Sequence, residues 1–198
     1  MPLSCDQQAL ILNMSRRFVR EALHGLSPQC PSDCEPWLRE PAGCFVSLHA
    51  LEGHRLRGCV GRIDASQPLI EALCSSSAHV LRDPRFTRDP VRLDELPLLA
   101  IEVSVLSAPK LAPGPLAFDL FNDGIYLSFG TRTGCFLPQV ARETGWTREQ
   151  LLERLCIEKL GLPHHTWRHP DARLHTFSVV VIGPERFDPP QSSVPAAF

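Results

Sequence analysis

The sequence carries no excess of charge of either sign. Its 198 residues include 20 Lys and Arg against 22 Asp and Glu, which gives a formal net charge of −2. The general electrostatic attraction that draws a protein to nucleic acid is therefore missing, and we expect no nucleic-acid partner. The composition also shows no shift that would divide the chain, so a single domain with one sizeable core is expected.

Long hydrophobic runs and a leader segment are missing as well. No apolar run approaches the roughly 20 residues that a membrane-spanning helix needs. The first residues, MPLSCDQQALILNMSRRF, have no basic segment ahead of their apolar residues, unlike a secretion signal. These absences predict a soluble, cytoplasmic protein that does not interact with a membrane.

The eight cysteines lack the paired CxxC spacing of a zinc site. In a cytoplasmic protein they are expected to be reduced thiols rather than a disulfide framework. Cys30 and Cys34 form an isolated CPSDC motif in a proline-bearing loop. A metal or redox role of this pair stays open, although structural zinc would require two further ligands. We predict no metal site and no cofactor.

The stretch HRLRGCVGR, residues 54–62, is the strongest candidate for a site of chemistry. Gly58 and Gly61 carry no Cβ, so the backbone around Cys59 can bend or let a ligand approach closely. Arginines on both sides would favour the thiolate if they lie close to the sulfur. The pattern predicts an available thiol at Cys59.

Alternating apolar residues predict a β-hairpin around this stretch. Strands over 44–51 and 56–63 would be joined by a loop over 52–54. The resulting register pairs Leu48 with Gly58, Val46 with Val60 and Ser47 with Cys59. The face opposite to the apolar residues then holds Cys59, Arg57, Ser47 and His49. A shift by one residue would exchange the two faces.

Helical spacing and capping signals predict three longer helices. The first covers 4–23 and leads into a long surface connection over 26–42. The second begins at a cap on Ser66 and ends at residues 83–84, and the third begins at the capping box of Thr147. The apolar faces of these helices are expected to pack into the core.

Strand signals fill most of the remaining chain. Residues 98–106 alternate cleanly, which places Glu102 on the face opposite to the apolar side chains, either solvated or paired in a pocket. A short helix begins at Pro138, and a proline-rich tail over 184–198 that is extended or disordered follows the domain, residues 1–183. Further extended segments are expected over 118–121, 125–129, 134–137 and 174–182.

Two functions fit these residues. In the first, Cys59 is the nucleophile of an enzyme, and backbone N–H groups near Gly58 and Gly61 hold a developing oxyanion. The base is His49 or Glu102, and the alternative histidines are His54 and His79. The competing interpretation is that Cys59 is a small buried residue at a tight backbone crossing.

In the second function, the protein is a binding or scaffold module. Arg57, Cys59 and Gln139 would hold a small anionic ligand or a segment of a partner, because arginine pairs well with carboxylates and phosphates. Against this, arginine on a strand is often simply solvated, and Gln139 can equally cap the short helix after Pro138. Three histidines in a loop are expected to be exposed rather than to bind metal, namely His164, His165 and His169.

The motifs LRGCVG, DPRF, IEVSVLS and FLPQV, in this order, resemble the AMME critical region domain family. In bacteria and archaea this domain is protein A of the AmmeMemoRadiSam system. The resemblance runs from about residue 4 to residue 183, and LRGC followed by a hydrophobic residue and glycine is the family's signature. The GW of 145–146 and KLGLP of 159–163 add agreement. The family usually has isoleucine in place of Val60 and KAGLP in place of KLGLP.

The resemblance implies an α+β fold with antiparallel or mixed sheets flanked by helices. It also implies a larger lobe with both termini, a smaller lobe, and an LRGC motif near the cleft between them. Memo-like and radical SAM proteins are the implied partners in a pathway or complex, but no reaction is implied. The chain lacks the CxxxCxxC motif that holds a radical SAM cluster, so such chemistry would belong to a partner.

Overall fold

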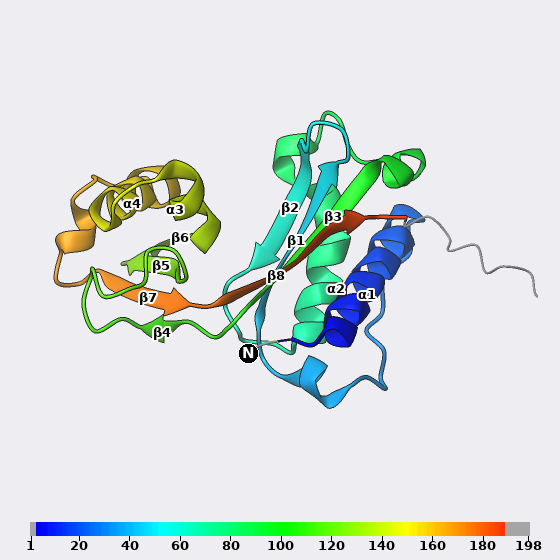
Figure 1. The fold of residues 1–198 in the computed structure, drawn as a ribbon, viewed down its shortest axis with the longest axis horizontal. Helices are drawn as coiled ribbons and strands as arrows, with labels where there is room; N and C mark the ends of the chain where they lie inside the picture. The colour runs from blue at the N-terminus through cyan, green and yellow to red at the C-terminus, as the bar shows by residue number, and fades with distance from the viewer. Residues whose placement is uncertain (1–2, 189–198) are drawn as a thin grey trace, which may run out of the picture.

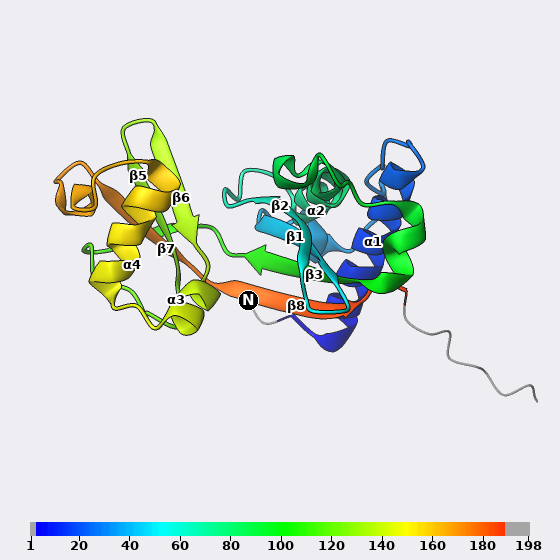
Figure 2. The ribbon, with the colours of Figure 1, turned by 90° about the horizontal axis from the view of Figure 1, so that it is seen from above.

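The structure, a computed structural model, describes residues 3–188 and contains two four-stranded antiparallel sheets. The first has the strand order β2-β1-β3-β8 and the second the order β4-β7-β5-β6. The chain enters the second sheet after β3 and leaves it before β8 (Figures 1 and 2). We call residues 3–106 and 179–188 the first unit, and residues 107–178 the second unit. The α+β fold class is confirmed.

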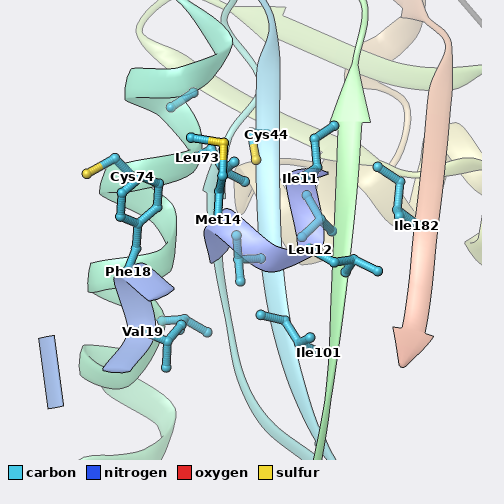
Figure 3. Close-up of a cluster of buried hydrophobic side chains, with 14 of the residues drawn as sticks. Ile11, Leu12, Met14, Phe18, Val19, Cys44, Leu73, Cys74, Ile101 and Ile182 are labelled. Carbon is cyan, nitrogen blue, oxygen red and sulfur yellow. The ribbon is translucent and has the colours of Figure 1, made fainter. Parts of the chain in front are cut away.

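Two helices cover one face of the first sheet. They are α1 (Cys5–Leu23) and α2 (Leu69–His79). The strands of this sheet are β1 (Gly43–Ala50), β2 (Leu56–Arg62), β3 (Leu99–Leu106) and β8 (Val179–Arg186). Figure 3 shows the core between the helices and the sheet, which includes Phe18 of α1, Leu73 of α2 and Ile101 of β3. Alternate residues of the strands therefore face away from the helices.

The second unit has its own core and its own helices. Its strands are β4 (Lys110–Leu111), β5 (Gly124–Phe129), β6 (Arg132–Phe136) and β7 (Arg173–Phe177). The helices are α3 (Pro138–Thr144) and α4 (Arg148–Leu155), which continues as a π-helix, η5 (Cys156–Leu160). Ile125, Leu152 and Leu174 are among the buried residues that hold it together. Within residues 3–188, no helix combines the length and the apolar character needed to cross a membrane.

Several sequence predictions of elements are confirmed. The first helix begins at the reciprocal capping box of Ser4 and Gln7, and Thr147 caps α4 in the same way. The hairpin has the predicted register, with Leu48 opposite Gly58, Val46 opposite Val60 and Ser47 opposite Cys59. A bulge after Leu48 then shifts the pairing by one residue. The connection over 26–42 contains only a short 3-10 helix, η1 (Pro36–Arg39).

Other predictions of elements are wrong for local reasons. Ser66 does not cap α2, because its hydroxyl donates to Asp64 at 2.5 Å and accepts from Arg62. Residues 118–121 form a turn, since the Asp119 carboxylate accepts hydrogen bonds from the backbone N–H groups that follow it. The predicted strand 174–182 is two strands, β7 and β8, which pair in different sheets.

The predicted tail begins later than expected. Strand β8 continues through Pro184 to Arg186, and the side chain of Phe187 is fully buried in the first core. The boundary at residue 184 is therefore wrong, and the first unit extends at least to Phe187. The rest of the predicted tail, residues 189–198, lies outside the described residues.

Candidate functional site

A row of polar side chains crosses the first sheet on the face away from the helices. Ser47 of β1 lies opposite Cys59 of β2 on one side and opposite Glu102 of β3 on the other. His49 lies two residues farther along β1, so it points to the same face. Ser47 is buried, whereas the other three side chains are half-buried. We call these four residues the polar row.

The environment of Glu102 connects the polar row to the second unit. Burial raises the pKa of Glu102, nearby His49 lowers it, and the Glu143 carboxylate of α3 raises it again. Helix α3 therefore brings charge close to the row. The Nε2 atom of His49 and the Oε1 atom of Gln139, also on α3, are both buried without a hydrogen-bond partner in the described part of the chain.

Two charged residues hold the backbone of Cys59. Strand β2 is the edge of the sheet, and the N–H of Cys59 donates to Asp83 Oδ2 at 2.9 Å. The guanidinium of Arg85 donates to the carbonyl oxygen of Cys59 at 3.2 Å and to Asp83 Oδ2 at 2.6 Å. The bond to Arg85 is the main reason that the pKa of Asp83 falls to about 2. We call Asp83 and Arg85 the clamp.

Sequence reasoning missed the clamp. The DPRF motif of residues 83–86 forms a short 3-10 helix in which Asp83 also accepts from the N–H of Arg85. The motif itself carries a signal for such a clamp. A carboxylate can accept a hydrogen bond from a backbone N–H while a guanidinium two residues away donates to a backbone C=O. Nothing in the spacing pointed to Cys59 as the target.

The two glycines beside Cys59 have packing roles. A Cβ on Gly58 would lie 2.5 Å from the carbonyl oxygen of Val80, where α2 ends. A Cβ on Gly61 would collide with the backbone of Cys44 and Phe45 on β1. The N–H of Cys59 itself is occupied by a carboxylate, so it is not free to bind an oxyanion. Close approach of neighbouring backbone thus accounts for both glycines.

Arg57 is held in a buried ion-pair network. Its side chain is only 2% exposed, and it donates to Asp89 at 2.6 Å and to Glu95 at 2.9 Å. Both terminal nitrogens are therefore bound to carboxylates of the chain itself, which differs from the predicted role of presenting Arg57 to an anionic ligand. Three histidines predicted to be exposed are exposed, namely His164, His165 and His169.

A second thiol and a hollow lie on the side of the second unit. The pKa of Cys135 on β6 is raised to about 11, chiefly by burial, while Lys159 lowers it and Cys59 makes a smaller raising contribution. The hollow has a volume of about 590 Å³. Arg62 of β2 and Thr133 of β6 both line it, so it opens between the two sheets. Cys59 is not among its lining residues.

These features define a class: two-sheet α+β proteins in which a DPRF clamp fixes an edge-strand cysteine beside a polar row. The AMMECR1 family model matches residues 12–182, so the chain belongs to the AMMECR1 family.

Two similar proteins come from archaea. Protein PH0010 from Pyrococcus horikoshii is 34% identical, and the match covers 88% of each chain. Protein MJ0810 from Methanocaldococcus jannaschii is 36% identical over 90% of each chain. The crystal structure of the uncharacterized protein PH0010 superposes with a TM-score of 0.78 and covers 87% of this chain and 88% of its own.

Proposed function

We propose that the protein acts through the polar row as a cysteine-dependent enzyme, in a pathway with Memo-like and radical SAM partners. Cys59 would be the nucleophile, and Glu102 or His49 would be the base. The observation that carries the proposal is the register that aligns Cys59, Ser47 and Glu102 across three strands. A thiol, a hydroxyl and a carboxylate on one face are the groups that nucleophilic catalysis uses.

The state of Glu102 supports its role as a base. Burial raises the pKa of this carboxylate, so it holds a proton more tightly than an exposed glutamate. His49 offers a second acceptor, because its Nε2 atom has no partner among the described residues. In the proposed step, the Cys59 thiol loses its proton to one of these groups. The thiolate then displaces a leaving group from an electrophilic carbon of the substrate, and the protonated base returns the proton to that leaving group.

The clamp supports the role of Cys59 as a fixed nucleophile. An edge strand without partners would be free to fray, but the clamp bonds both the N–H and the C=O of Cys59. The sulfur would thus be presented from a rigid backbone, which limits the loss of orientation in the reaction. The partners would supply the radical chemistry.

The test is the rate of alkylation of Cys59 by iodoacetamide as a function of pH, followed by peptide mass spectrometry. We expect Cys59 to be alkylated faster than Cys135 over the whole pH range. Cys135 is the internal comparison, since burial raises its pKa to about 11. Glu102→Gln and His49→Gln should each shift the Cys59 profile. A Cys59 thiol that reacts no faster than Cys135 would contradict the enzymatic proposal.

A binding module is the second candidate, and one observation favours it. The unpartnered His49 Nε2 and Gln139 Oε1 atoms are groups that a ligand or a partner's segment would satisfy. Co-purification with the Memo-like and radical SAM proteins would then survive Cys59→Ser and fail with Gln139→Ala. Binding that is unchanged in Gln139→Ala would argue against this candidate.

A further inference from the structure

Two cysteines outside the polar row lie against each other. Cys30 is in the connection over 26–42, and Cys74 is in α2. The Cys30 thiol donates to the carbonyl oxygen of Ile70 at 3.7 Å, and the Cys74 thiol donates to that of Pro28 at 3.5 Å. Each sulfur thus lies beside the backbone that carries the other, and Cys30 is near enough to raise the pKa of Cys74.

The two thiols differ in exposure and acidity. Cys30 is exposed, whereas Cys74 is 7% exposed. The pKa of Cys74 is raised to about 12, chiefly by burial, with smaller raising contributions from Cys30 and Glu21 and a lowering one from Arg17. An external reagent therefore reaches Cys30 first, and Cys74 is placed to react only with Cys30.

We propose that Cys30 and Cys74 are a redox modification site, which a low-molecular-weight disulfide oxidises to an intramolecular disulfide. The Cys30 thiolate attacks one sulfur of the reagent and releases one thiolate, which leaves a mixed disulfide on Cys30. The Cys74 sulfur then attacks the Cys30 sulfur, which breaks the mixed disulfide, and the proton of Cys74 passes to the departing reagent thiolate, which leaves as a thiol. Two protein thiols are oxidised, one disulfide is reduced to two thiols, and the connection becomes tied to α2.

Cys34 is the matched control within the same connection. It lies four residues after Cys30, and its side chain is half-buried against the first core. It also lines a hollow of about 500 Å³ beside Met14 and Arg17 of α1. Its neighbours are thus on α1, whereas those of Cys30 are on α2.

The experiment uses the full reduced chain, incubated with oxidised glutathione, blocked with iodoacetamide and digested with trypsin. Cleavage after Arg20, Arg39, Arg62 and Arg82 gives one peptide with Cys30 and Cys34 and another with Cys74. We expect these two peptides to be linked in the wild type and in Cys34→Ser, and unlinked in Cys30→Ser. Cys74→Ser should keep glutathione on Cys30. Oxidation should raise the thermal midpoint of the wild type but not that of Cys30→Ser.

Three results would overturn the proposal. They are a link that persists in Cys30→Ser, a bond between Cys30 and Cys34 in its place, and a wild-type protein that only accumulates glutathione on Cys30. Because Cys30 is exposed, Cys30→Ser is expected to fold. The proposal can therefore still be tested with Cys30→Ser if Cys74→Ser does not fold. None of these results depends on Cys59, so they do not test the proposed function, which the alkylation of Cys59 tests separately.

Discussion

At the scale of single residues, Asp83 does for Cys59 what a neighbouring strand would do. An edge strand exposes alternate N–H and C=O groups, and unsatisfied groups of this kind destabilise a fold. The side chain of Asp83 is 3% exposed and accepts from both the Cys59 N–H and Arg85. Charge-assisted bonds of this type are stronger than neutral ones. The stability of the site therefore depends on the ionised form of one carboxyl group.

This dependence predicts an acid-sensitive contribution to stability. The folded-state pKa of Asp83 is about 2, below the ordinary value for aspartate, so its ionised form stabilises the protein at neutral pH. The contribution is lost as the pH falls from about 4 toward 2. We expect Asp83→Asn to lower the free energy of unfolding by about 2 kcal/mol at pH 7, and to have a smaller effect near pH 2. Urea denaturation of the wild type and of Asp83→Asn at several pH values measures this difference in the free energy of unfolding.

Asp64→Asn is the control for this prediction. Arg62 and Ser66 also lower the pKa of Asp64 to about 2, but its side chain is 55% exposed in its bridge to Arg62. Water screens such a pair, so the loss should stay below about 1 kcal/mol. Equal effects of the two substitutions would contradict the importance of the clamp.

Arg57 gives the second prediction at this scale. Lysine keeps the charge but loses the planar fork that reaches Asp89 and Glu95 together. We expect Arg57→Lys to lower the free energy of unfolding by about 1–3 kcal/mol. Arg55→Lys should change it by less than about 0.5 kcal/mol, because Arg55 is 66% exposed and lies 4.0 Å from Asp89. Similar losses in a denaturation experiment would mean that Arg57 is not held as described.

At the scale of elements, sequence patterns succeeded where local and tertiary preferences agree. The hairpin register was predictable because apolar alternation and the turn at Gly53, which has a φ of +67°, lead to the same pairing. Ser66 failed as a cap because Asp64 and Arg62 compete for its hydroxyl. A capping signal shows that a side chain can bond the helix N-terminus, but it does not show whether another hydrogen-bond partner binds that side chain instead.

The packing of β2 against the end of α2 gives a third prediction. Gly58→Ala would place a methyl group 2.5 Å from the Val80 carbonyl oxygen, and a backbone atom cannot move away as a flexible side chain can. We expect a loss of about 1–3 kcal/mol in the free energy of unfolding. The matched control is Gly114→Ala, since a Cβ there meets nothing within 4 Å. A neutral effect of Gly58→Ala would show that β2 and α2 are less tightly packed than described.

At the scale of the whole molecule, the family resemblance predicted the fold class, whereas the local patterns did not predict how the chain divides between two sheets. The run from Leu174 to Ile182 has continuous strand character, yet Ser178 separates β7 of the second sheet from β8 of the first. Alternation of apolar and polar residues indicates a strand with one buried face, but it does not indicate which sheet the strand joins. For the same reason, the approach of Glu143 to Glu102 was not predictable from the motifs.

Because the two units have separate cores, we expect a substitution in one core to destabilise that unit and not the other. Leu73 in the first core and Leu152 in the second are both fully buried, so either Leu→Ala substitution should cost about 2–5 kcal/mol. Leu152→Ala should accelerate amide hydrogen exchange in β5–β7 while β1 and β3 stay protected, because these two strands pair within the first sheet. Leu73→Ala should reverse the pattern. If either substitution accelerated exchange equally in both sheets, the two units would unfold together, which would contradict their independence.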